Sequence, residues 1–428
     1  MIFCKKAGWG MALLFLCLIF GTGRTQKIEA AVQNVSESLE EESRLDTVGT
    51  DQETERAAVR EKKGQKEKEA GDTETDQAAA AQDELLAELD FDAIQQEVDS
   101  LLSSQQFSFA GTVRSLLQDG DPFRIFRAGN AVLSCAKTAF LAQKGLMKEL
   151  FLLVLAGAVL GSFSSLFEGK QVRDASFYMV YLLALALILK NFQSSGENLK
   201  AVITSLVAFM RILTPSYYLA AAAAGGASSA VMFYQMLLLV ILAVEKLLLA
   251  LVLPMIHIYL LIALVNDLSG EEILSHMTEL LETCVNGLLK SSLGVLVGMQ
   301  MIRNLIAPAL DSLRQMALWR TAGMIPGIGN AVNAVTELVA GSAVLIRNCF
   351  GVTAMLVLLA AGMVPAVQLL VSGLSFRLLA AAAQPVSDKR IAGCLAAAGK
   401  GYAMLLRLLL TVEVLFLLTI AILAGTFS

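Results

Sequence analysis

The sequence predicts an all-α fold: a polytopic helical membrane protein with about seven spans and an internal tandem repeat, preceded by a signal sequence and a disordered acidic segment. Three observations predict it. The 428 residues are 56% hydrophobic and 17% charged, whereas soluble domains average about 45–50% apolar and about 25% charged residues. The mean hydropathy is +0.64, and the apolar residues form long runs. Lipid is therefore the expected solvent for most of the chain.

Residues 1–30 have the pattern of a secretory signal sequence. Lys5 and Lys6 form a positive start, and Met11–Phe20 is a short apolar stretch. A small-residue cleavage site lies near Ala30 and Ala31, although an uncleaved signal anchor is the alternative. Either form places the segment that follows outside the cytoplasm.

Residues 31–82 are predicted to be disordered. From Ala31 to Asp121 the chain has 23 acidic and 8 basic residues, a net charge of −15, whereas Pro122–Ser428 carries +7. A polar segment with few apolar residues cannot bury enough surface to offset its ordering entropy. Residues 83–121 differ, because from Asp83 to Leu102 apolar residues recur at steps of three and four. They predict an extracytoplasmic amphipathic helix that lies on the membrane domain or docks a partner protein.

Residues 122–428 form the predicted polytopic domain. A span needs about 20 residues, and runs of this kind recur along the domain. One of them, 36 residues long, could be a helical hairpin or one span with an embedded segment. The predicted spans are Leu150–Phe167, Phe177–Leu189, Leu199–Ala224, Ala230–Val265, Val285–Ile306, Phe350–Ala383 and Tyr402–Ala424.

Four prolines indicate the internal repeat. Pro215 and Pro254 are 39 residues apart, as are Pro326 and Pro365, and the two pairs are offset by 111 residues. Each interval passes from small residues to a long aliphatic run. The predicted repeats cover about 212–310 and 323–425, and the four prolines are candidate hinges. Tandem repeats are common in membrane transport scaffolds.

The sequence predicts no catalytic, cofactor or metal site, and so no enzyme. It has no P-loop and no HExxH motif, and its six cysteines and two histidines form no ligand pattern. Basic residues are scattered among apolar runs, which does not favour nucleic-acid binding.

Charged residues at apparent membrane depth are the remaining candidates. Charge in hydrocarbon is costly, so such residues usually face a bundle interior, a cavity or a partner. Snorkelling to an interface is the alternative, particularly for Lys290, Arg303 and Arg407. We expect the glutamates to line a polar seam or to meet a basic partner helix. The candidate pore or partner contacts are Glu245, Lys246, Arg407 and Glu413.

Two segments resemble a known family. They are Met324–Leu370 (MIPGIGNAVNAV and onward) and Ala380–Leu395 (AAAAQPVSDKRIAGCL). Both are similar to the stage III sporulation protein AE family of endospore-forming bacteria. The order of signal sequence, polar segment and polytopic core matches too. The resemblance covers about Pro122–Ser428 and is strongest after Leu310.

The resemblance implies a function that composition does not show. It implies a non-enzymatic, membrane-embedded core subunit of a mother-cell-to-forespore channel, a specialised secretion or feeding apparatus. It also implies a location in the mother-cell membrane around the forespore. The implied partners are other membrane subunits, ring-forming subunits, a separate cytoplasmic ATPase and the lipid bilayer. The alternative is a stand-alone secondary transporter or permease that uses its buried carboxylates.

Overall fold

The computed structural model describes residues 91–102, 107–119, 128–164, 170–221, 239–243, 245–269, 274–322, 329–385 and 387–425. Within these ranges the chain is entirely helical. Three of the helices exceed 45 residues, and the longest has 55. The helices are α4 (Phe91–Leu101), α5 (Phe109–Asp119), α6 (Ala128–Ser164), α7 (Lys170–Ala221), the π-helix η3 (Glu245–Val252), α9 (Leu253–Ser269), α10 (Ser275–Ala322), α11 (Gly329–Ala383) and α12 (Lys389–Gly425).

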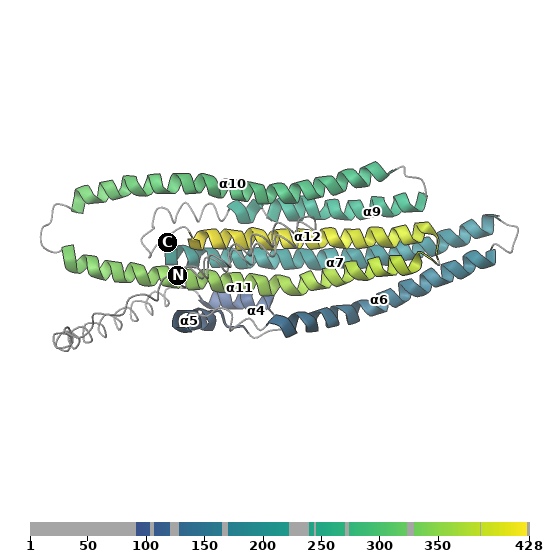
Figure 1. Cartoon of the computed structure of the whole chain (residues 1–428), viewed down its shortest axis with the longest axis horizontal. Coiled ribbons are helices and arrows are strands. Elements are labelled where there is room, and N and C mark those ends of the chain that lie inside the picture. Colours follow the sequence, from purple (N-terminus) through teal and green to yellow (C-terminus); the bar gives the residue numbers. More distant parts are fainter. Residues whose placement is uncertain are drawn as a thin grey trace, which may run out of the picture.

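The long helices lie side by side and run alternately in opposite directions (Figure 1). Three helical hairpins, α6–α7, α9–α10 and α11–α12, turn at the same end of the bundle. At 1.5 Å per residue, α11 is about 80 Å long. The hydrocarbon core of a bilayer is about 30 Å thick, so α11 is much longer than a single crossing requires.

Five helices of the described residues are long and apolar enough to cross a membrane. The predicted count of seven is not confirmed, and Leu150–Phe167, mainly in α6, is not among the five. The five segments are Tyr178–Tyr217, Leu239–Ser269, Ser275–Gly298, Gly341–Ala383 and Lys389–Ala421.

The structure differs from the sequence prediction at α7. The predicted spans Phe177–Leu189 and Leu199–Ala224 were separated by a polar stretch, but α7 continues through it without a break. The reason is that this stretch has packing partners within the bundle. Phe192 and Leu199 are buried, and Asn191 is hydrogen bonded to another helix.

Two short helices cover one part of the bundle. α4 lies within the predicted amphipathic segment, buries Ile94 and Val98 completely, and packs against α7. α5 packs against α11, where the Phe109 ring meets Phe350 edge-on at 5.0 Å between centroids. The signal sequence and the acidic segment, residues 1–82, lie outside the described residues.

Each of the two predicted repeats contains one of the hairpin turns. The α9–α10 turn follows Ser269 and the α11–α12 turn follows Ala383, 114 residues later. Pro215 and Pro365 lie inside α7 and α11, and Pro254 is the second residue of α9. Pro326 lies outside the described residues. These positions are compatible with duplication, and the repeat stays a prediction.

Candidate functional site

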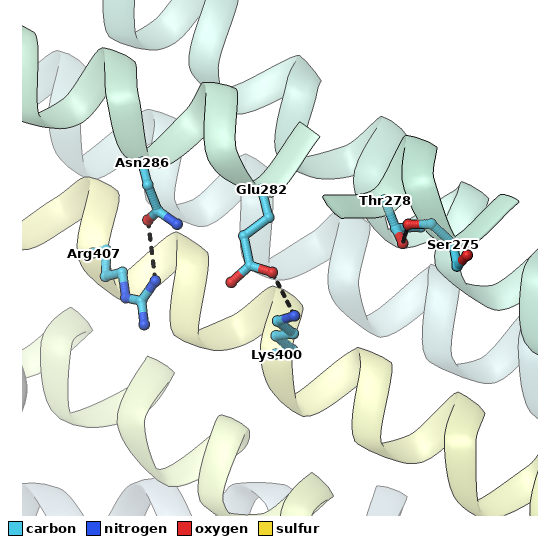
Figure 2. Close-up of polar contacts among 6 residues, drawn as sticks. All are labelled: Ser275, Thr278, Glu282, Asn286, Lys400 and Arg407. Atoms are coloured by element: carbon cyan, nitrogen blue, oxygen red, sulfur yellow. Dashed lines mark hydrogen bonds and ion pairs between the residues drawn. The ribbon is translucent and has the colours of Figure 1, made fainter. Parts of the chain in front are cut away.

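Polar side chains join α10 to α12 in a row that we call the α10–α12 seam: Glu282 and Asn286 of α10, Lys400 and Arg407 of α12 (Figure 2). Lys400 and Glu282 form an ion pair. Arg407 donates a hydrogen bond from Nη1 to Asn286 Oδ1 at 3.1 Å. Residues four and seven apart lie on one helix face, so each helix presents its two residues to the other.

The seam is partly accessible. The Lys400 and Glu282 side chains are 49% and 25% exposed, and Lys400 Nζ lies 6.0 Å from the centre of the Tyr259 ring. Exposed ion pairs in water contribute about 0–1 kcal/mol. Charged side chains at membrane depth usually pair with one another or face a cavity. The seam therefore indicates where α10, only 17% buried in its most apolar window, meets the bundle.

A second group of polar side chains is buried around Tyr402, which is fully buried. Asn191 Nδ2 donates to the Tyr402 hydroxyl at 2.6 Å, and Ser195 Oγ lies 3.2 Å from the same hydroxyl. Ser195 donates its own proton to the Asn191 carbonyl at 2.9 Å. The Tyr402 hydroxyl therefore accepts from Asn191 and donates to Ser195.

Aromatic rings enclose this group. Tyr402 stacks on Phe376 of α11 with centroids 5.2 Å apart and meets Phe192 of α7 edge-on at 5.2 Å. We call Asn191, Phe192, Ser195, Phe376 and Tyr402 the Tyr402 cluster. It joins three long helices at one level, which locks their register along the bundle axis.

His257 lies next to the Tyr402 cluster. Its Nδ1 is 2.9 Å from the Leu253 carbonyl oxygen, and since a carbonyl only accepts, Nδ1 carries the proton. Its Nε2 lies against Gly196, where an added Cβ would be 2.5 Å from that nitrogen. Glycine is therefore required at 196 for α7 to approach α9 this closely.

Glu413 is the buried acid on α12. Its side chain is 2% exposed, and neither carboxyl oxygen has a hydrogen-bond partner. The carboxyl group fits into a notch in α11 at Gly362, because a Cβ added at Gly362 would collide with Oε1 and Cδ of Glu413. It faces α11 and not the α10–α12 seam.

The four predicted contact residues are not brought together. Arg407 belongs to the α10–α12 seam, and Glu413 lies against α11. Lys246, in η3, is exposed, as expected for a snorkelling lysine. Glu245 is the first residue of η3, but its side chain lies outside the described part.

Sequence reasoning missed Asn286, Asn191 and Ser195. Their only signal was a polar residue in a helical stretch, and their partners are distant in sequence. Among the described residues, no group of three or more His, Cys, Asp or Glu side chains is placed to hold a metal ion.

Comparison with known proteins identifies relatives of this chain. Residues 107–426 match the family model described as stage III sporulation protein AE. The chain is also 22% identical over 291 residues to stage III sporulation protein AE of Bacillus subtilis (strain 168), covering 67% of this chain and 73% of that protein. No solved structure matches the chain significantly. The match begins at residue 107, so α4 lies outside it.

Proposed function

Because this chain belongs to the stage III sporulation protein AE family and so has a role in sporulation, we propose that it is the membrane-embedded core subunit of the mother-cell-to-forespore channel. The channel is a secretion or feeding apparatus needed for forespore development. The subunit itself is non-enzymatic and its energy comes from a separate cytoplasmic ATPase.

The observation that carries the proposal is the distribution of side chains on the long helices. Large apolar side chains recur at steps of three and four on the outer faces of α7, α9 and α11, whereas the polar pairs described above lie between helices. Exposed stripes of this kind are rare on soluble proteins and are suited to lipid or to other subunits. The exposed apolar residues of these stripes are Met179, Leu182, Leu183, Ile258, Leu261, Val265, Leu370, Leu374 and Leu378.

The two ends of the bundle support an orientation in the membrane. α4 and α5 pack near the α7 end that carries Tyr217, which is 6.4 Å from Phe350 between ring centroids. The hairpin turns lie at the opposite end, where α12 begins with Lys389 and Arg390 (Figure 1). Basic residues are enriched on the cytoplasmic side of membrane proteins. We place α4, α5 and the leader outside the cytoplasm.

The proposal includes the path of the chain through the membrane. The signal sequence delivers the leader across the mother-cell membrane that surrounds the forespore. The spans that follow it are partly duplicated, and they are fewer than seven because α7 combines two of the predicted ones. The unusual length of α7, α10 and α11 supports contacts beyond the bilayer, with the ring-forming and other membrane subunits.

A stand-alone secondary transporter is the second candidate, because Glu413 is a buried carboxyl group without a hydrogen-bond partner. Intramembrane carboxyl groups often mark ion or proton pathways. The two candidates differ in what they require. A channel subunit needs its partners, whereas a transporter moves a solute alone.

Deletion and purification test the proposal together. A deletion strain of the spore-forming host should complete engulfment and then stall in forespore development, and the wild-type sequence should restore spores. The tagged protein, extracted in mild detergent during sporulation, should co-purify with the ATPase and the ring-forming subunits. Normal spores from the deletion strain would exclude the proposal. Solute uptake by the purified protein alone, without these partners, would favour the transporter.

A further inference from the structure

The notch between α11 and α12 is filled by one acidic side chain. Glu413 fills the space that a side chain at position 362 would occupy, so glycine is required there. Both oxygens of its carboxyl group are buried without a donor. The residues that flank it on α12, Val412 and Val414, are buried and apolar.

A proline removes one backbone donor from the same part of α11. Pro365 lies inside α11, three residues after Gly362. Proline has no backbone N–H, so the carbonyl oxygen four residues earlier, that of Ala361, loses its helical donor. Ala361 is adjacent to Gly362 in the chain. The backbone of α11 therefore supplies one N–H fewer in the turn that follows Gly362, against which the Glu413 carboxyl group packs.

No cationic side chain of the described residues supplies the missing donor. Arg347 is the other buried charged residue in this part of the chain, and it lies fifteen residues before Gly362 on α11. That separation is about 22 Å along the helix, which is beyond the reach of an ion pair. Arg407 is bonded to Asn286 in the α10–α12 seam.

The space and the ligands restrict what can occupy the site. An ionised carboxylate without a partner costs several kcal/mol when buried. Glu413 is in contact with α11 and is 2% exposed, so no side chain of a partner protein fits beside it. A divalent cation would leave an uncompensated positive charge beside this single buried carboxylate, which is as costly as the unpaired carboxylate itself. The remaining class of occupant is a proton or a small monovalent cation.

We propose that Glu413, in the notch at Gly362, is a binding site for a monovalent cation, either a proton or Na⁺. The cation neutralises the carboxyl group and allows α11 and α12 to pack at this point. The inference goes beyond the proposed function and does not depend on it, because the site is complete within one chain. Separation of α11 and α12 at the notch is therefore coupled to release of the cation, and their association to its binding.

Infrared spectroscopy and thermal unfolding of the full chain in lipid nanodiscs distinguish the two cations. A bound proton predicts a protonated-carboxyl C=O band that is absent from Glu413→Gln and unaffected by NaCl. The matched control, Asp267→Asn, removes a different partly buried acid and should keep the Glu413 band. Bound Na⁺ predicts no such band, but a Tm that is about 5 °C higher in saturating NaCl than in choline chloride. That difference should be absent from Glu413→Gln.

A second variant keeps the test decisive if Glu413→Gln does not fold. Gly362→Ala places a methyl group where the carboxyl group lies, so it should shift the wild-type band or abolish the NaCl effect. Gly298→Ala is the control, because a Cβ there meets open space. A wild-type protein with neither a protonated Glu413 band nor stabilisation by NaCl would overturn the proposal.

Discussion

Removal of the Tyr402 hydroxyl should destabilise the bundle by a small, definite amount. In Tyr402→Phe the ring keeps its contacts with Phe376 and Phe192, 5.2 Å away in each case. Asn191 loses its acceptor and Ser195 loses a donor. A hydrogen bond within a membrane bundle contributes on average about 0.6 kcal/mol and at most about 1.7 kcal/mol. The expected loss for two bonds is about 1–2 kcal/mol.

A larger truncation should show the contribution of the ring. Tyr402→Leu also removes both aromatic contacts, each worth about 0.5–1.5 kcal/mol, and leaves a cavity. The expected loss is about 3–5 kcal/mol. The control is Ser291→Ala, because Ser291 is exposed and bonds only the Leu288 carbonyl of its own helix. It should change stability by less than about 0.5 kcal/mol.

The assay is reversible unfolding of the purified protein in mixed micelles, titrated with SDS and followed by far-ultraviolet circular dichroism. The predicted order of stability is wild type and Ser291→Ala, then Tyr402→Phe, then Tyr402→Leu. Equal stability of Tyr402→Phe and wild type would show that α7 and α12 do not meet at Asn191. The register derived from the Tyr402 cluster would then be wrong.

Three further predictions concern other contacts. Glu282→Gln should lower the free energy of unfolding by less than about 1 kcal/mol, because the ion pair with Lys400 is partly exposed. A double-mutant cycle with Lys400→Met that shows no coupling energy would contradict the ion pair. Gly373→Leu should lower the free energy of unfolding by about 1–3 kcal/mol in the same SDS titration, because even a Cβ at position 373 would lie 3.2 Å from the Cβ of Tyr402. Gly298→Leu is the control and should leave stability unchanged, because position 298 faces open space. Ile94→Asp should release α4 from the bundle, because Ile94 is fully buried. Limited proteolysis should then cleave α4 faster than in the wild type, and unchanged cleavage would exclude the packing of α4 on α7.

Composition and apolar runs were sufficient to predict an all-α membrane protein, and the quoted segments were sufficient to predict the family. The continuity of α7 was not predictable from its own residues. The stretch from Lys190 to Lys200 is polar and reads as a loop. Its partner Tyr402 lies 211 residues away from Asn191, and only the folded chain brings them together.

The partners of the charged residues were equally unpredictable from local sequence. The apolar flanks of Glu413 indicated a residue inside the membrane domain. They did not indicate the glycine notch, because Gly362 lies on another helix. Arg407 was assigned to an interface or a bundle interior, and its partner Asn286 had no signal beyond being polar. Local sequence reports the depth of a residue, whereas its partner depends on the register between helices.

Sidedness is the most direct test, since the proposed topology is a bundle that crosses a membrane with α4 and α5 outside and the hairpin turns in the cytoplasm. Single cysteines at Ser100 of α4 and Gln384 of the α11–α12 turn, both exposed, would be introduced after replacement of the six native cysteines. In intact vegetative cells that express the protein, a membrane-impermeant maleimide should label the cysteine at position 100. The cysteine at position 384 should react only after permeabilisation. Labelling of position 384 in intact cells, or protection of position 100, would contradict the account.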